Sequence, residues 1–261
     1  MLRGKYVTNE QIRGLYLDLM RNCLTGLLYN DPPMAMVPSG DGILPFDRHV
    51  REIGLDWPAN AQSMIGQKRM LQLQRAAEFV IERDIPGDFI ETGVWRGGSC
   101  ILLRAILKVY GVVDRKVWVA DSFAGLPPPD PERYPADAAS TFHEFKALAV
   151  PLASVQENFR RYDLLDDQVE FLVGWFKDSL PKAPIEKLAI LRLDGDLYES
   201  TLDALTALYD KVSTGGFIIV DDYGVVENCR IAVSDFREAQ KITDTIYNID
   251  GTGVFWQKLS G

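Results

Sequence analysis

The pattern of hydrophobic and polar positions changes at about residue 85 of the 261-residue chain. Before this point, apolar residues recur at helical spacing over residues 12–29 and 63–84, and the Pro/Gly-rich stretch 30–45 separates the two segments. We therefore predict that residues 1–84 form an N-terminal helical cap.

Beyond this point, short apolar runs alternate with helical segments. The apolar runs occupy residues 88–93, 116–123, 169–176, 187–195, 216–223, 245–250 and 253–258. Alternation of strands and helices, with nearly all-apolar strands, predicts a parallel sheet covered by helices on both faces. The last two runs are separated by a Gly-Thr pair and predict an antiparallel pair of strands. Residues 85–261 are thus expected to form one α/β domain.

Composition narrows the class of protein. The net charge is −9 and there is no run of Lys or Arg, so the chain is a poor candidate for binding nucleic acid or anionic membranes. The apolar runs are far shorter than a membrane span and the N-terminus lacks the apolar core of a signal peptide, so we expect a cytoplasmic protein. The three cysteines match no ligand spacing and there are only two histidines, so any bound metal must be held mainly by oxygen.

The stretch 91–99, ETGVWRGGS, places an acid and three glycines between a predicted strand and a predicted helix. Gly93, Gly97 and Gly98 do not match the dinucleotide pattern G-x-G-x-x-G, which disfavours a nicotinamide oxidoreductase. Glycine lets the backbone approach a ligand, and a helix N-terminus presents free N–H groups to a carboxylate or phosphate. Glu91 would repel a polyphosphate but would attract an ammonium group or accept from hydroxyls. A plain tight turn is the alternative.

Polar and aromatic residues also stand at the ends of the next predicted strands, where the ligand crevice of an open parallel sheet lies. Asp121 is placed to accept from a ribose diol, with Ser122 beside it. Trp175 and Phe176 end the third predicted strand, where an adenine could stack, and ordinary core packing is the alternative for them. A ligand with an amino-acid end, a ribose and an adenine matches S-adenosylmethionine (SAM) better than NAD.

Four carboxylates, Asp194, Asp196, Asp221 and Asp222, directly follow the two most apolar strands. They would repel one another unless a cation lies between them, and all-oxygen ligation suits Mg²⁺. Such a metal lowers the pKa of a substrate hydroxyl, so that a neighbouring carboxylate can deprotonate it near neutral pH. Solvated acids at loop starts are the alternative, but a module that only binds SAM has no use for this cluster.

From about Tyr16 to the C-terminus, the sequence resembles the TylF/macrocin O-methyltransferase family through the strings SMIG, ETGVWRGGS, WVADSFAGLP, LLDDQVEFLVGWFKDSLP, LAILRLDGDLYEST and GGFIIVDDY. These are SAM- and Mg-dependent enzymes that methylate sugar hydroxyls of macrolide and related antibiotics. The resemblance implies a class I methyltransferase fold, with a Rossmann-like seven-stranded sheet whose last strand is antiparallel and an N-terminal helical extension. It also implies a homodimer in which N-terminal segments take part in assembly.

The resemblance, taken with the strand-end residues, assigns roles to single positions. The expected SAM-binding residues are Ser63, Met64, Ile65, Glu91, Thr92, Gly93, Gly97, Ser99, Asp121, Ser122, Gly174, Trp175 and Phe176. The expected Mg²⁺ ligands are Asp194, Asp221 and Asp222. Asp196 is the candidate general base, with Asp194 and His143 as the alternatives.

The Pro-rich loop 124–150 is predicted to be a lid, because loops of this length in a compact domain often cover an active site. Its His143 is a substrate contact, a second base or an ordinary surface histidine. The predicted function is Mg²⁺-assisted O-methylation, by SAM, of a deoxysugar hydroxyl in a glycosylated natural product of the macrolide or aminocoumarin type. Catechol-type methylation of a small molecule and a non-catalytic SAM-binding module are the alternatives.

Overall fold

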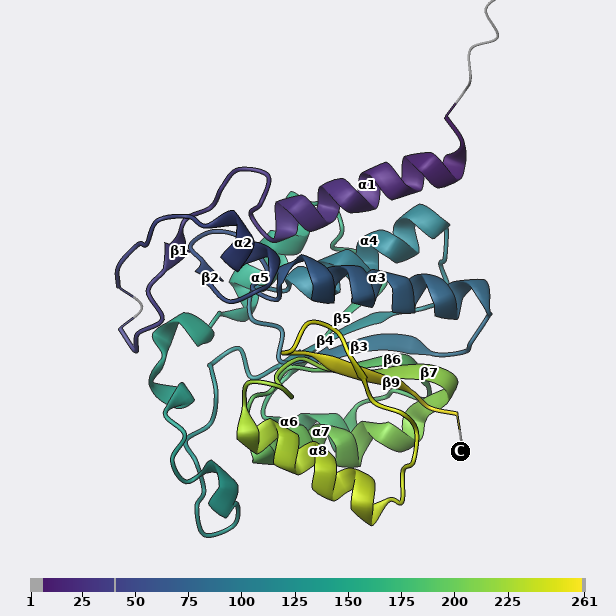
Figure 1. Cartoon of the computed structure of the whole chain (residues 1–261). Helices are drawn as coiled ribbons and strands as arrows, with labels where there is room; N and C mark the ends of the chain where they lie inside the picture. Colours follow the sequence, from purple (N-terminus) through teal and green to yellow (C-terminus); the bar gives the residue numbers. More distant parts are fainter. Residues whose placement is uncertain (1–6, 40, 260–261) are drawn as a thin grey trace, which may run out of the picture.

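A seven-stranded sheet forms the centre of the computed structural model, which describes residues 7–39 and 41–259 (Figure 1). Its strands are β3 (Asp88–Thr92), β4 (Val117–Asp121), β5 (Val169–Val173), β6 (Leu188–Leu193), β7 (Val212–Val220), β8 (Tyr247–Asn248) and β9 (Val254–Gln257). Across the sheet they lie in the order β5-β4-β3-β6-β7-β9-β8. Strands β3 to β7 pair in parallel, and β9 pairs antiparallel with both β7 and β8. The predicted sheet is therefore present, including its antiparallel last strand.

Helices cover both faces of this sheet (Figure 1). One face carries α3 (Gly66–Glu82), α4 (Gly98–Tyr110) and α5 (Leu152–Arg161), with α1 (Asn9–Leu24) packed outside α3 and α4. The other face carries α6 (Phe176–Ser179), α7 (Tyr198–Leu208) and α8 (Glu227–Ala239). Each face therefore has its own hydrophobic core. No helix in the described ranges is long and apolar enough to cross a membrane.

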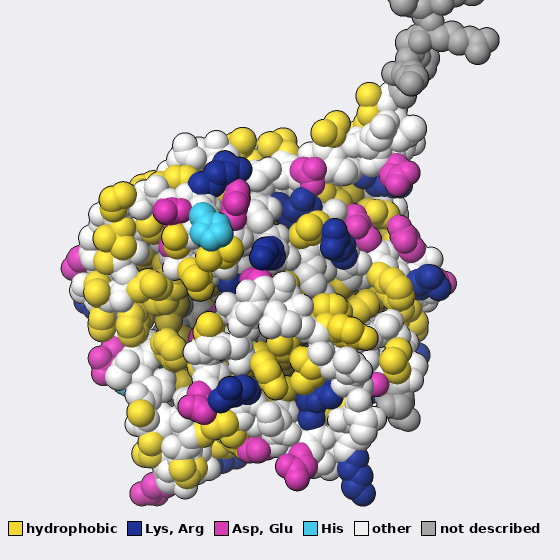
Figure 2. Space-filling view, viewed as in Figure 1, with side chains coloured by type: hydrophobic (Ala, Val, Ile, Leu, Met, Phe, Trp, Pro, Cys, Tyr) yellow, Lys and Arg dark blue, Asp and Glu magenta, His cyan; other side chains and the backbone are white. Residues whose placement is uncertain are grey.

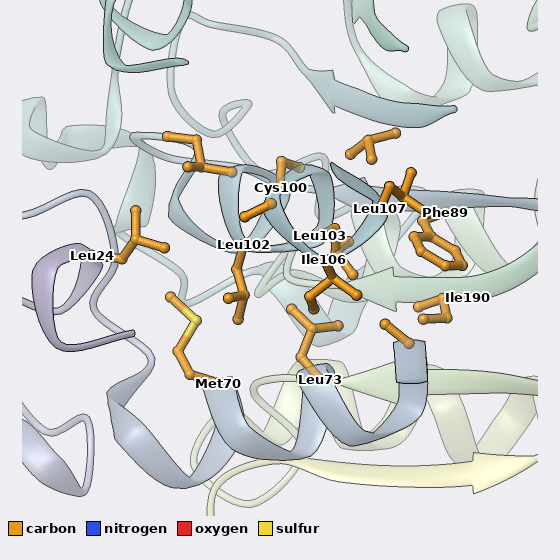
Figure 3. Close-up of a cluster of buried hydrophobic side chains, with 14 of the residues drawn as sticks. Leu24, Met70, Leu73, Phe89, Cys100, Leu102, Leu103, Ile106, Leu107 and Ile190 are labelled. Atoms are coloured by element: carbon orange, nitrogen blue, oxygen red, sulfur yellow. The ribbon is translucent and has the colours of Figure 1, made fainter. Parts of the chain in front are cut away.

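Helix α4 is the central helix of the first layer and is buried along most of its length. Its sequence is apolar on nearly every side, so it packs against the sheet, α3 and α1 at once. Figure 3 shows its side chains between neighbours from α1, α3, β3 and β6, including Leu24, Met70, Leu73, Phe89 and Ile190. This packing fixes the N-terminus of α4 at the carboxyl ends of the parallel strands.

The N-terminal segment is not purely helical. Between α1 and α3 it contains three short elements: β1 (Pro33–Met34), α2 (Arg48–Glu52) and β2 (Trp57–Pro58), with β1 and β2 paired antiparallel. Arg51 is fully buried, and its guanidinium donates to the carboxylate of Asp56 and to the backbone carbonyls of Thr25 and Asp31. One arginine thus joins the end of α1, the β1–β2 region and α2.

The predicted lid, residues 124–150, is a series of turns in the structure. It contains three 3-10 turns: Pro135–Asp137, Phe142–Glu144 and Lys146–Leu148. The indole Nε1 of Trp95 donates to the carbonyl of Ala147 at 2.8 Å, and the amide of Lys146 donates to the carbonyl of Pro38 at 3.1 Å. The end of the loop is therefore attached both to the glycine turn and to the N-terminal segment.

Candidate active site

A cavity of about 680 Å³ opens at the carboxyl ends of the parallel strands. Each parallel strand contributes at least one residue within one position of its carboxyl end: Glu91 from β3, Asp121 from β4, Gly174 after β5, Asp194 after β6 and Asp221 after β7. The parallel order of the strands brings these distant positions to one edge of the sheet. The volume lies within the usual range of small-molecule sites.

Close packing requires glycine at position 93, in the turn between β3 and α4. Gly93 has a φ of +89°, and a Cβ atom added to it would lie 1.8 Å from the carbonyl oxygen of Asp194. A larger residue would push this turn away from the turn that follows β6. Gly93, Gly98 and Ser99 line the cavity; the amide of Gly98 donates to the carbonyl of Gln62 at 3.0 Å, and the next N–H groups in the first turn of α4 have no helical acceptor. The glycine turn therefore packs closely against the turn after β6 and also leaves its backbone open to a ligand in the cavity.

Asp121 is held rigidly at the end of β4. The backbone amides of Val94 and Phe123 donate to its two carboxylate oxygens at 2.8 and 2.7 Å. Burial raises the pKa of this carboxyl, and these hydrogen bonds oppose that rise. Each carboxylate oxygen can accept more than one hydrogen bond, so Asp121 keeps capacity for a ligand hydroxyl.

Arg192 is the main residue of the site that sequence reasoning missed. It lies on β6, is 1% exposed, and donates to Glu91, to Asp221 and, at 2.7 Å, to Asp194. Burial by itself lowers its pKa, but the surrounding carboxylates outweigh this effect and raise the pKa above its usual value. The sequence could have indicated this role, because an arginine is unusual in a strand that is buried on both faces and must there pair with an acid.

A second arginine stabilises the same carboxylates from α3. Arg69 donates to Asp221, to Asp250 at 3.0 Å and to the carbonyl of Gly54 at 2.9 Å. Both oxygens of Asp221 thus accept from an arginine, one from Arg69 and the other from Arg192. Two buried cations therefore offset part of the negative charge of the strand-end acids.

Glu91 has structural partners that the sequence did not indicate. It is 2% exposed; one carboxylate oxygen accepts from Arg192, and the other accepts from the thiol of Cys100 at 3.0 Å. Burial raises its pKa, while the charge of Arg192 opposes this shift. Glu91 still lines the cavity, so its expected contact with the SAM ammonium group stays a prediction.

Asp194, Asp221 and Asp222 form a cluster in which one oxygen from each lies within 4.8 Å of the others. Among the residues that the structure describes, Oδ2 of Asp222 is buried without a hydrogen-bond partner. Burial and the charge of Asp221 raise the pKa of Asp194 to about 8, and burial with the neighbouring acids raises that of Asp222 well above its usual value. Mutually repelling carboxylates with an unpaired oxygen are a donor set that fits Mg²⁺.

Asp196 lies in the same cavity but outside this three-oxygen cluster. It occupies the short turn between β6 and α7 and has a left-handed φ of 56°. Burial and then the charge of Asp221 raise its pKa to about 7. Asp196 is thus a carboxyl beside the cluster, available to exchange a proton with a ligand.

Most of the predicted site residues line the cavity, and three do not. Thr92 is buried in β3, with its hydroxyl 3.4 Å from the carbonyl of Arg192. Gly97 faces Val155 of α5. His143 is exposed in its 3-10 turn, and the cavity lining contains its neighbour Phe142 instead. The structure therefore does not bring these three residues to the cavity.

The outer part of the cavity has an apolar wall that sequence reasoning did not identify. Its members come from the N-terminal segment, the loop and the turn after β7: Met36, Leu55, Trp57, Leu126, Pro127, Pro128, Phe142, Leu148, Val225 and Val226. Met36 and Leu55 are more than half exposed. Figure 2 shows hydrophobic side chains gathered on the left of the molecule, over the region of β1 and β2. The wall thus faces the open cavity rather than a closed core.

Comparison with known proteins finds relatives over nearly the whole chain. The family described as "Macrocin-O-methyltransferase (TylF)" matches residues 13–258. The 8-demethyl-8-(2,3-dimethoxy-alpha-L-rhamnosyl)-tetracenomycin-C 4'-O-methyltransferase of Streptomyces olivaceus is 52% identical over 250 residues, 95% of this chain and 94% of that protein. The demethyldecarbamoylnovobiocin O-methyltransferase of Streptomyces niveus is 51% identical over 245 residues, 94% and 93% of the two chains. The solved structure of the O-methyltransferase NovP superposes with a TM-score of 0.91 at 50% identity, covering 95% of this chain and 100% of that one.

Proposed function

Because this chain belongs to the TylF macrocin-O-methyltransferase family, we propose that it methylates a deoxysugar hydroxyl of a glycosylated natural product, with SAM as the methyl donor. The relatives confirm the predicted family, the class I methyltransferase fold and the O-methyltransferase activity. One observation carries the proposal: a single cavity joins the expected SAM residues to a three-carboxylate cluster and an apolar wall. The test is mass spectrometry of glycosides after incubation with the protein and labelled SAM, with the label expected on the sugar.

We place SAM over the ends of β3, β4 and β5. Asp121 accepts from the ribose hydroxyls, Glu91 attracts the ammonium group, and Trp175 contacts the adenine. The first turn of α4 receives the carboxylate, because its N–H groups and helix dipole favour an anion. This arrangement leaves the carboxylate cluster and the apolar wall for the acceptor.

We place Mg²⁺ on Asp194, Asp221 and Asp222, where the unpaired oxygen of Asp222 supports the assignment. When bound, the ion would lower the pKa of the acceptor hydroxyl. Asp196 then removes the hydroxyl proton as general base. SAM, when bound, would supply the methyl group: as the acceptor oxygen forms the new C–O bond, the C–S bond would break and its electron pair would pass to sulfur. The products are the methyl ether, S-adenosylhomocysteine and a proton held by Asp196.

The apolar wall contacts the aglycone when the sugar lies at the carboxylate cluster. Met36, Leu55 and Trp57 contribute from the N-terminal segment, and Phe142 and Leu148 contribute from the loop. Burial of apolar surface stabilises a bound ring system without fixing its identity, by about 25 cal/mol for each Å² removed from water. A sugar that carries an apolar aglycone is therefore the acceptor class that we propose.

Asp121→Ala is expected to weaken SAM binding by about 10- to 150-fold, because the loss of a charged hydrogen-bond partner costs about 1.5–3 kcal/mol. Isothermal titration calorimetry measures this loss. Asp121 also holds the amides of Val94 and Phe123, so a circular dichroism melt must show that the variant is folded. Wild-type SAM affinity in a folded variant would remove Asp121 from the proposed site.

We also propose a homodimer that uses α1. Ile12, Leu15 and Leu19 are each more than half exposed, on the side of α1 opposite the fully buried Leu17 and Leu24. Their spacing places them along one helix face, which forms an apolar stripe. Leu15→Glu is expected to convert a dimer into a monomer in multi-angle light scattering, with the melting temperature retained. A wild-type protein that is monomeric at high concentration would contradict this assembly.

A further inference from the structure

Asp137 belongs to the loop 124–150, but its side chain is buried against two helices. It is 1% exposed, although it lies in a turn far from either helix in sequence. One carboxylate oxygen accepts from the amide of Tyr198 at 2.8 Å and from the side-chain amide of Asn228 at 2.9 Å. The other accepts from the amide of Glu199 at 2.9 Å. A single loop carboxylate therefore bonds to the first turns of both α7 and α8.

Helix α7 follows β6 and the turn with Asp194 and Asp196, and helix α8 follows β7 and the turn with Asp221 and Asp222. Helix α7 begins two residues after Asp196, and the backbone of Asp222 accepts from the amide of Val226, the residue before α8, at 2.8 Å. A shift of either helix start would therefore move the acids next to it. Asp137 connects the Asp194–Asp196 turn to the Asp221–Asp222 turn from outside the sheet.

The turn before α7 needs such support. Asp196 has a left-handed φ of 56°, which is less favourable than for glycine, although Asp and Asn adopt it more readily than other residues. The residue at the N-cap of α7 is Leu197, whose side chain makes no capping hydrogen bond. The amides of Tyr198 and Glu199 donate to Asp137 instead. Asp137 thus accepts the hydrogen bonds that the side chain of an N-cap residue usually accepts.

We propose that Asp137 is a positioning residue that fixes the spacing between the two acid-bearing turns. The inference deepens the proposed function and rests on it, because the spacing matters through the carboxylates assigned to the metal and the base. It also divides the predicted lid: residues 135–137 form a fixed anchor, and any closure belongs to the stretches on either side. The loop thus sets the geometry of the acids as well as bordering the acceptor space.

Asp137→Asn tests this role with little change in volume. Its amide nitrogen must face at least one of the three donors, so the spacing of the turns is disturbed while the loop can still fold. We expect kcat to fall by about 10- to 100-fold, as small misplacements of catalytic groups do, with the dissociation constant of SAM nearly unchanged. The matched control is Asp88→Asn. Asp88 accepts from the amide of Lys116 and the indole of Trp118, and it lies at the amino end of β3, away from the carboxyl ends of the strands that form the site. This control is expected to lose a comparable amount of stability with wild-type kcat.

Hydrogen exchange measured by mass spectrometry gives a readout independent of activity. Asp137→Asn should speed amide exchange in residues 195–201 and 222–229, and the Asp88 variant should not. If Asp137→Asn does not fold, Asn228→Ala removes only the link to α8 and should lower kcat with a near-wild-type melting temperature. Wild-type kcat in a folded variant, or faster exchange confined to residues 134–141, would overturn the inference. If the wild-type chain methylates no glycoside, the proposed function fails, and the exchange comparison alone decides the role of Asp137.

Discussion

Asp196→Asn is expected to lower kcat by about 10²- to 10⁴-fold, the usual contribution of a general base. The carboxyl lies in the cavity beside the three-acid cluster without belonging to it, so its loss should leave SAM and Mg²⁺ affinities nearly intact. Asparagine tolerates the left-handed φ of 56° at this position, so the turn should keep its shape. Single-turnover kinetics with labelled SAM measure the chemical step directly.

The matched control for the base is His143→Asn. His143 is exposed in its 3-10 turn and does not line the cavity, so its removal should leave kcat unchanged. A large loss in the His143 variant, together with wild-type kcat in Asp196→Asn, would transfer the role of base to His143.

Removal of divalent metal is expected to lower turnover by more than about 100-fold, because the stabilisation that a metal gives to a developing oxyanion amounts to several kcal/mol. SAM should still bind to the chelated protein, since its proposed contacts lie on β3, β4 and β5. The chelated protein should also stay folded, because Arg192 and Arg69 offset the charge of Asp221. EDTA treatment followed by dialysis, with activity assayed before and after Mg²⁺ is restored, tests this prediction.

Asp222→Asn provides the matched variant. It replaces the carboxylate that has a buried unpaired oxygen by a neutral amide, so the variant should need more Mg²⁺ for half-maximal activity. Full activity after exhaustive chelation would mean that the cluster of Asp194, Asp221 and Asp222 has another use.

The sheet and the location of the site were predictable because both depend on local patterns. Five apolar runs that alternate with helices allow essentially one architecture, and the strand ends of a parallel sheet converge at one edge. Asp121, Asp194 and Asp221 could therefore be placed together from their positions alone. The helical N-terminal cap was predicted less completely, since β1 and β2 have two residues each and leave no periodic signal.

The interactions among site residues were not predictable, because they join distant parts of the chain. Arg192 bonds to Glu91, 101 residues away, so the pairing follows only from the β3–β6 neighbourhood. The role of Asp137 could not be predicted, because it lies in a Pro-rich stretch whose composition indicates a loop but not which of its residues are buried. The sequence could not decide between a substrate contact, a second base and a surface histidine for His143, because composition does not show which residue of a 3-10 turn faces the cavity; the lining contains Phe142 and not His143.

A single assay tests whether the chain transfers a methyl group to a sugar hydroxyl with the help of the proposed Mg²⁺ site and Asp196. Deoxysugar glycosides, their free aglycones and a catechol are incubated with the protein, Mg²⁺ and methyl-labelled SAM, then fragmented in a mass spectrometer. We expect the label on the sugar fragment of at least one glycoside, no label on the free aglycones, and loss of the label with Asp196→Asn. Label found only on the catechol or an aglycone would refute sugar methylation, and label transferred to the sugar at the wild-type rate by Asp196→Asn would refute the role of Asp196 as base.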